Sequence, residues 1–156
     1  MEAPIHNTFV VERSYRAPPE RVFAAFADAT KKRRWYAESD GHSVETFEMD
    51  FRVGGVERML YRLGAATPFP GTELGSEGAY YDIVPNERIV VASGMTLGGR
   101  RISVSMLTFE FVKTDAGTDL VCTHQGVFFE GADGPEMREG GWRLLLDKLG
   151  KEFPAS

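Results

Sequence analysis

A carboxylate and an imidazole are the side chains of this sequence best suited to acid–base chemistry. Glu57 lies in the segment VERMLYR and His124 in the segment LVCTHQGVFF, both rich in apolar residues. In an apolar cavity such a pair could act as a tuned acid and base for an aldol-type cyclisation, a dehydration or a hydrolysis. A carboxylate left unpaired in a core would instead be costly or protonated. Glu57 and His124 are therefore catalytic candidates, provided that the fold brings them together.

Other catalytic chemistry has little support in the sequence. The three histidines, His6, His42 and His124, lack the spacing of metal ligands, and Cys122 is the only cysteine. Neither a phosphate-binding glycine loop nor a G-x-S-x-G nucleophile motif occurs. We therefore predict no metal site and no cofactor.

Composition and charge narrow the classes of partner. The formal net charge of −5 argues against nucleic acid as the main partner, and the basic run KKRR (Lys31–Arg34) is expected to be a solvated helix face. No apolar run approaches the roughly 18 residues of a membrane span, and the N-terminus lacks a signal pattern. With a single cysteine as well, the expected location is cytoplasmic. The length of 156 residues indicates one domain over residues 1–156.

The elements that would position these residues follow from periodicity and turn signals. A strand is predicted within Asn7–Pro18, followed by a helix over Pro19–Asp28 and a short second helix over Thr30–Ser39. Six further strands, separated mostly by tight turns, are predicted over Ser43–Phe51, Gly55–Leu63, Glu77–Val84, Arg88–Met95, Arg101–Val112 and Thr118–Phe129. A long helix over Gly140–Phe153 ends the chain.

This order predicts an α+β fold with a seven-stranded, curved antiparallel sheet wrapped around the C-terminal helix. A twisted sheet of this size curls, and the long helix is the element available to cover its concave face. Gly140 and Gly141 are unexpected in such a helix, since each costs up to about 1 kcal/mol relative to alanine. Either they leave room for a ligand or a close strand, or the helix begins only at Gly141.

Several strings of the sequence resemble a known superfamily. The element order is similar to the helix-grip fold of START-like, birch-allergen-like and polyketide-cyclase-like (SRPBCC) domains. More narrowly, the strings resemble the subgroup related to the C-terminal domain of the activator of the heat-shock-protein-90 ATPase. The resemblance implies a cavity beneath the long helix, with Trp35 packed near its end, but no particular ligand; Glu57 departs from the apolar residue usual in relatives. The matching strings are Arg16–Tyr36, Val53–Gly55, Glu77–Val91, Gly117–Val127 and Gly140–Leu149.

Strand alternation predicts which side chains line that cavity. With Arg58, Arg62 and Asp82 outside, Glu57 and Tyr81 face inward, as do Ala79 and Ile83. Arg138, on the same helical stripe as Trp142, would present a cation to an acidic ligand or pair with Glu57. For each of these residues a plain packed core is the alternative, and a single β-bulge would invert the faces of a strand. The predicted cavity residues are Trp35, Met59, Tyr61, Tyr81, Ser93, Ser105, Leu107, His124, Arg138, Trp142, Leu145 and Leu149.

Three functions remain open at this point. The first, which we favour, is a binding domain for a hydrophobic small molecule of apolar, aromatic or lipid-like character. The second is an enzyme of the cyclase, aromatase or hydrolase kind that uses Glu57 and His124. The third is a protein-interaction module that binds a chaperone or another protein, as the resemblance implies. The sequence is compatible with a monomer or a homodimer.

Overall fold

The structure, a computed structural model, describes residues 2–38 and 42–154. Its elements follow in the predicted order, with a short α-helix and a π-helical turn in place of the predicted second helix. The helical elements are α1 (Pro19–Ala27), α2 (Ala29–Lys32), the π-helix η1 (Arg33–Ala37) and α3 (Pro135–Gly150). The strands are β1 (Ile5–Tyr15), β2 (Ser43–Met49), β3 (Val56–Arg62), β4 (Glu73–Val84), β5 (Arg88–Leu97), β6 (Arg100–Lys113) and β7 (Thr118–Phe128).

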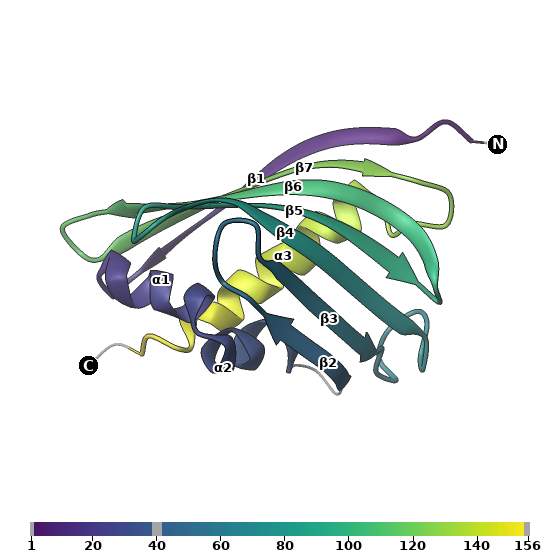
Figure 1. Cartoon of the computed structure of the whole chain (residues 1–156), viewed down its shortest axis with the longest axis horizontal. Helices are drawn as coiled ribbons and strands as arrows, with labels where there is room; N and C mark the ends of the chain where they lie inside the picture. Colours follow the sequence, from purple (N-terminus) through teal and green to yellow (C-terminus); the bar gives the residue numbers. More distant parts are fainter. Residues whose placement is uncertain (1, 39–41, 155–156) are drawn as a thin grey trace.

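All seven strands form one antiparallel sheet in the order β1-β7-β6-β5-β4-β3-β2. Consecutive strands from β2 to β7 are neighbours, and β1 closes the far edge by pairing with β7. The sheet curves over α3, which runs diagonally beneath it, while α1 and α2 lie at one end (Figure 1). The predicted fold class is therefore confirmed: this is an α+β, helix-grip architecture.

Local residue chemistry accounts for three of the element boundaries. Pro19 occupies the first turn of α1, where its missing N–H is not needed. The side chain of Asp28 caps α2 by accepting a hydrogen bond of 3.0 Å from the Lys31 backbone N–H. Between β5 and β6, Gly98 and Gly99 have φ values of 59° and 82°, which suit a two-residue hairpin turn.

Two predicted boundaries differ from the structure by more than three residues. β4 begins at Glu73, four residues earlier than predicted, because the chain beyond the β3–β4 loop already pairs with β3 and β5. α3 begins at Pro135 and contains both glycines, so the alternative of a helix starting at Gly141 is wrong. The predicted end of the second helix, Ser39, lies outside the described residues.

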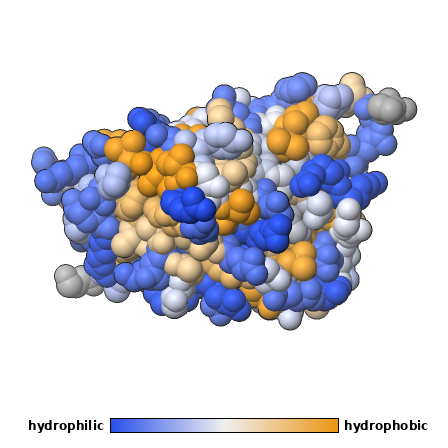
Figure 2. Space-filling model, viewed as in Figure 1, coloured by the Kyte–Doolittle hydropathy of each residue, from blue (hydrophilic) through white to orange (hydrophobic). Residues whose placement is uncertain are grey.

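The core lies between the concave face of the sheet and the helices. Val22, Phe23 and Phe26 of α1 share one face of this helix, are buried, and close one end of the curl. Phe26 packs against Phe109 and Phe111 of β6, with ring centroids 4.9 and 5.3 Å apart. On the face seen in Figure 2, apolar side chains gather in separate patches interrupted by hydrophilic ones. In the described part of the chain, none of the helices combines the length and apolar character needed to cross a membrane.

Candidate functional site: a cavity beneath the C-terminal helix

A cavity of about 340 Å³ lies between α3, the strands β3 to β5 and the β3–β4 loop; we call it the main cavity. Its walls are largely apolar and aromatic. The side chains of Phe69, Met137 and Leu144 are about half exposed and form part of its wall. The lining residues are Tyr36, His42, Met59, Tyr61, Leu63, Thr67, Pro68, Phe69, Leu74, Met95, Leu97, Ile102, Asp133, Met137, Arg138, Gly141, Trp142, Leu144, Leu145 and Lys148.

Five predicted cavity residues line this space: Met59, Tyr61, Arg138, Trp142 and Leu145. They come from β3, where inward and outward residues alternate without interruption, and from α3, where the helical period is likewise uninterrupted. Burial raises the pKa of Tyr61 to about 12, so its phenol is neutral at physiological pH. These five positions give the cavity an aromatic and aliphatic wall with one cation beside it.

A much smaller cavity of about 20 Å³, the inner chamber, lies deeper under the sheet. The predicted residues Ser93 and Leu107 line this chamber instead of the main cavity. Tyr36 and Trp142 line both spaces, and their ring centroids are 5.9 Å apart. The concave face thus holds two spaces separated by an aromatic wall. The chamber is lined by Lys32, Tyr36, Glu57, Ser76, Gly78, Val91, Ser93, Leu107, Phe109 and Trp142.

The placement of Tyr81 in the cavity is wrong. Its side chain is 67% exposed, whereas Tyr80 is 2% exposed and points into the core. The cause is a register shift between Tyr80 and Asp82 in the β4–β5 pairing, which inserts one extra residue and inverts the faces on one side of it. Gly78, and not Ala79, consequently lines the inner chamber, while Ile83 packs against the core as predicted.

The four remaining predicted cavity residues, Trp35, Ser105, His124 and Leu149, are buried in the core and line neither space. Trp35 donates a hydrogen bond of 2.9 Å from Nε1 to the carbonyl of Ala25, which ties η1 to α1. Leu149 is fully buried on the inner face of α3. For these residues the plain-core alternative describes the structure better than a role in the cavity wall.

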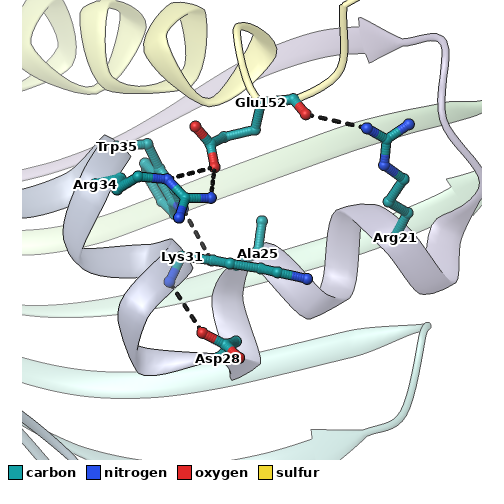
Figure 3. Close-up of polar contacts among 7 residues, drawn as sticks. All are labelled: Arg21, Ala25, Asp28, Lys31, Arg34, Trp35 and Glu152. Carbon is teal, nitrogen blue, oxygen red and sulfur yellow. Dashed lines mark hydrogen bonds and ion pairs between the residues drawn. The ribbon is translucent and has the colours of Figure 1, made fainter.

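Figure 3 shows how Arg34 of η1 is held against Glu152, which lies just beyond the C-terminal end of α3. Arg34 Nε and Nη2 both donate to Glu152 Oε1, at 3.1 and 2.5 Å. From α1, Arg21 Nη2 donates to the Glu152 backbone carbonyl at 3.3 Å. Together with the Trp35 bond, these contacts fix the position of η1 and therefore one side of the aromatic wall.

Arg138 is buried beside the main cavity, but it does not pair with Glu57 as one alternative proposed. Its Nε and Nη2 donate to Oδ2 and Oδ1 of Asp133 at 2.7 and 2.8 Å, and Nη2 also donates to Ser103 Oγ at 2.9 Å. The guanidinium carbon lies 5.0 Å from the ring centroid of Phe128. The bidentate carboxylate neutralises the arginine within the protein, which removes the predicted free cation for an acidic ligand.

Glu57 belongs to a buried polar cluster at the inner chamber. Lys32 Nζ lies 2.6 Å from its Oε1 and 2.8 Å from its Oε2, and the Tyr80 hydroxyl donates to Oε2 at 2.7 Å. Burial, reinforced by the Glu57 carboxylate, raises the pKa of Tyr80 and of Tyr36. The expectation that KKRR is a wholly solvated face is therefore wrong at Lys32, which is 6% exposed.

His124 occupies a different cluster, so the expected acid–base pair is not formed. Its ring stacks on Phe9 with centroids 4.5 Å apart, and burial together with the charge of Arg138 lowers its pKa to about 4. Strand β7, which carries His124, is four strand spacings from β3, or about 19 Å along the sheet. Within the described residues neither Nδ1 of His124 nor Oγ of Ser105 has a hydrogen-bond partner. Glu57 and His124 therefore contact different neighbours and do not contact each other.

Sequence reasoning missed two groups of residues at these spaces. The first comes from the Pro/Gly-rich β3–β4 loop, whose Thr67, Pro68 and Phe69 fold onto the cavity. This loop is held at its base by bonds between Leu63 and Thr72 and between Gly71 and Leu63, each 2.9 Å. Its unusual length was the signal, since long ordered loops often border binding sites. The second group is Lys32 and Tyr36. They could be recognised only by knowing which faces of α2 and η1 point toward the sheet.

Among the residues that the structure describes, no strand lies close to α3 at Gly140 or Gly141, so the glycines are not explained by a close approach of the sheet. A β-carbon at either position would meet no heavy atom within 4 Å. Gly141 lines the main cavity, whereas Gly140 does not. Of the alternatives raised by the sequence, open space beside the cavity is the one compatible with Gly141.

A curved antiparallel sheet closed by a C-terminal helix over a cavity defines the helix-grip class of α+β proteins. Comparison with family models then places the chain more narrowly: residues 16–153 match the model described as Activator of Hsp90 ATPase homolog 1-like protein, and the chain belongs to this family. The subgroup inferred from the sequence is thereby confirmed. Comparison with curated proteins gives no match.

Solved structures with the same fold include proteins from three bacteria. A protein from Rhizobium leguminosarum has 36% identity and a TM-score of 0.88, over 96% of this chain and 95% of that one. A protein from Rhizobium loti has 41% identity and a TM-score of 0.86, over 97% and 99% of the two chains. An AHSA1-like protein from Aeromonas hydrophila, at 18% identity, has a TM-score of 0.66 over 93% and 90%, and it supports the fold alone.

Proposed function

We propose that this protein binds an apolar or aromatic small molecule in the main cavity. The observation that carries the proposal is the volume of about 340 Å³, within the range of about 300–1,000 Å³ that is typical of small-molecule sites. Its wall combines aromatic and aliphatic side chains such as Tyr61, Leu74 and Trp142 with few polar groups. Because Arg138 is already neutralised by Asp133, the ligand class expected is uncharged.

The test uses a neutral fluorescent probe, N-phenyl-1-naphthylamine, titrated into the purified protein. We expect saturable binding at one site with an increase in probe fluorescence. Gly141→Leu should weaken binding at least tenfold, because the new side chain extends from a residue that lines the cavity. Gly140→Leu is the matched control: it adds the same side chain to the same helix, one residue away and outside the lining, and should bind within twofold of wild type.

Circular dichroism and thermal unfolding would establish that both variants keep the fold. The proposal fails if the wild-type protein does not bind the probe. It also fails if the Gly140 and Gly141 variants weaken binding equally, because the binding site would then lie elsewhere.

A further inference from the structure

The inner chamber combines a small volume with four polar side chains, of which Lys32 and Glu57 are buried and Ser76 and Ser93 half-buried. Its volume of about 20 Å³ exceeds the roughly 10–15 Å³ that one water molecule occupies on the same measure, so it accommodates a single oxygen atom and its hydrogens. Around it stand the Lys32–Glu57 ion pair and the hydroxyls of Ser76 and Ser93, whose Oγ atoms are 3.1 Å apart. An apolar core gains nothing from such a group of side chains, because buried polar atoms must all be partnered.

The hydrogen-bonding capacity of this cluster is not exhausted by its internal contacts. The hydroxyls of Tyr36, Ser76 and Ser93 carry three hydrogens and make two contacts with one another, Ser76 with Ser93 and Ser76 with Tyr36, which leaves one hydroxyl hydrogen and several lone pairs over. Lys32 has three N–H donors, and Nζ faces the two carboxylate oxygens of Glu57. The chamber therefore offers both donors and acceptors to one more polar atom.

Charge sets the chemical class of that atom. Lys32 and Glu57 neutralise each other, so the chamber as a whole carries no net formal charge. A ligand carboxylate would face the Glu57 carboxylate, and an ammonium would face Lys32, each without a compensating partner in a desolvated space. A hydroxyl or carbonyl oxygen meets neither penalty.

We propose that the inner chamber anchors one uncharged oxygen, a hydroxyl or a carbonyl, of a ligand whose apolar body fills the main cavity. This inference rests on the proposed function and adds the polar recognition that an apolar cavity lacks. The path between the two spaces runs past Tyr36 and Trp142, the two residues that line both. The centroids of these two rings are 5.9 Å apart. When the rings move apart, the ligand oxygen can reach Ser76 and Ser93.

The experiment compares naphthalene, 2-naphthol and 2-naphthoate as competitors of N-phenyl-1-naphthylamine. One additional buried hydrogen bond contributes about 0.5–1.5 kcal/mol, so 2-naphthol should bind about two- to twelvefold more tightly than naphthalene. 2-Naphthoate, which is charged, should bind more weakly than naphthalene. In Ser93→Ala the advantage of 2-naphthol should fall below twofold while the affinity for naphthalene is unchanged.

Ser105→Ala is the matched control for Ser93→Ala. Ser105 lies directly opposite Ser93 in the β5–β6 pairing and is buried, but it does not line the chamber, whereas the half-buried Ser93 does. It should keep the full advantage of 2-naphthol. If naphthalene competes but 2-naphthol has no advantage, or keeps it in Ser93→Ala, the anchor is overturned and the proposed function stands. If none of the three compounds competes, the proposed function fails and the anchor fails with it.

Discussion

Lys32 Nζ lies within 2.8 Å of both carboxylate oxygens of Glu57, and the side chains of the two residues are only 7% and 10% exposed. The pair links α2 to β3 across the end of the curved sheet. The hydroxyl of Tyr80 from β4 donates a further hydrogen bond to the Glu57 carboxylate. Because charges so deeply buried are costly without a partner, this contact makes the position of α2 depend on one lysine.

Lys32→Met should therefore destabilise the protein strongly. It leaves the Glu57 carboxylate desolvated with only the Tyr80 hydrogen bond, and breaking a buried ion pair in this way costs about 3–5 kcal/mol. The free energy of unfolding, measured by urea denaturation at pH 7, would record this loss. Replacing both partners, in Lys32→Met with Glu57→Leu, should recover most of it, since no charge is then left unpaired.

Lys31→Met is the control for the lysine substitution, because Lys31 is exposed in the same short helix. It should change the free energy of unfolding by less than about 0.5 kcal/mol. A loss below about 1 kcal/mol in Lys32→Met would contradict the description of a buried, structurally coupled pair.

The stability of the protein should depend on pH through His124. Burial and the charge of Arg138 lower the pKa of His124 from 6.5 to about 4 in the folded protein, so the unfolded chain binds the additional proton first. The contribution of neutral His124 is thus complete above about pH 6.5 and is lost as the pH falls toward 4. By linkage it amounts to at most about 3 kcal/mol.

Carboxylates also titrate in this range and change the stability. The quantity to compare is therefore the difference in unfolding free energy between wild type and His124→Phe. Phenylalanine retains the stacking on Phe9 and Phe128 without a titrating group. The unfolding free energy of wild type relative to the variant should decrease steadily between pH 6.5 and pH 4. A difference that stays constant over this interval would show that His124 can be protonated in the folded state without cost.

Much of this fold could be predicted because its signals are local. Turn residues such as Gly98 and Gly99 separate the strands, and Pro19 marks the start of α1. The helical spacing from Val22 to Phe26 identified the face that closes one end of the sheet. Each of these features depends on a few consecutive residues, so none requires knowledge of the tertiary structure.

The candidate site was less predictable because its decisive features depend on contacts between distant segments. The bulge at Tyr81 exchanged the faces of two adjacent tyrosines, and nothing in the letters YY distinguishes them. Within KKRR, Lys32 alone is buried, since its helical phase directs it toward Glu57. Strand parity correctly placed Glu57 and His124 on the concave face, but it does not give their separation across the sheet.

Asp133→Ala should destabilise the protein by about 2–3 kcal/mol, because it removes two hydrogen bonds from the buried guanidinium of Arg138. The loss should be nearly the same at low and high salt, since a buried pair is weakly screened. Glu77→Ala provides the comparison: the Arg58–Glu77 pair is more than half exposed and should contribute at most about 1 kcal/mol. Chemical denaturation at two salt concentrations measures both. Equal losses in the two variants would show that burial of Arg138 adds nothing to its pairing.

Gly140→Ala and Gly141→Ala should each stabilise the protein. Both positions are helical with open space where a β-carbon would lie, so alanine removes a helix penalty of about 1 kcal/mol. For a chain of this size the melting temperature should rise by about 2–4 °C in each variant. Gly54→Ala is the opposite control, since its φ of 86° disfavours any β-carbon and its melting temperature should fall. A decrease in Gly140→Ala would mean that α3 is not helical at residue 140 and begins, as the sequence alone allowed, only at Gly141.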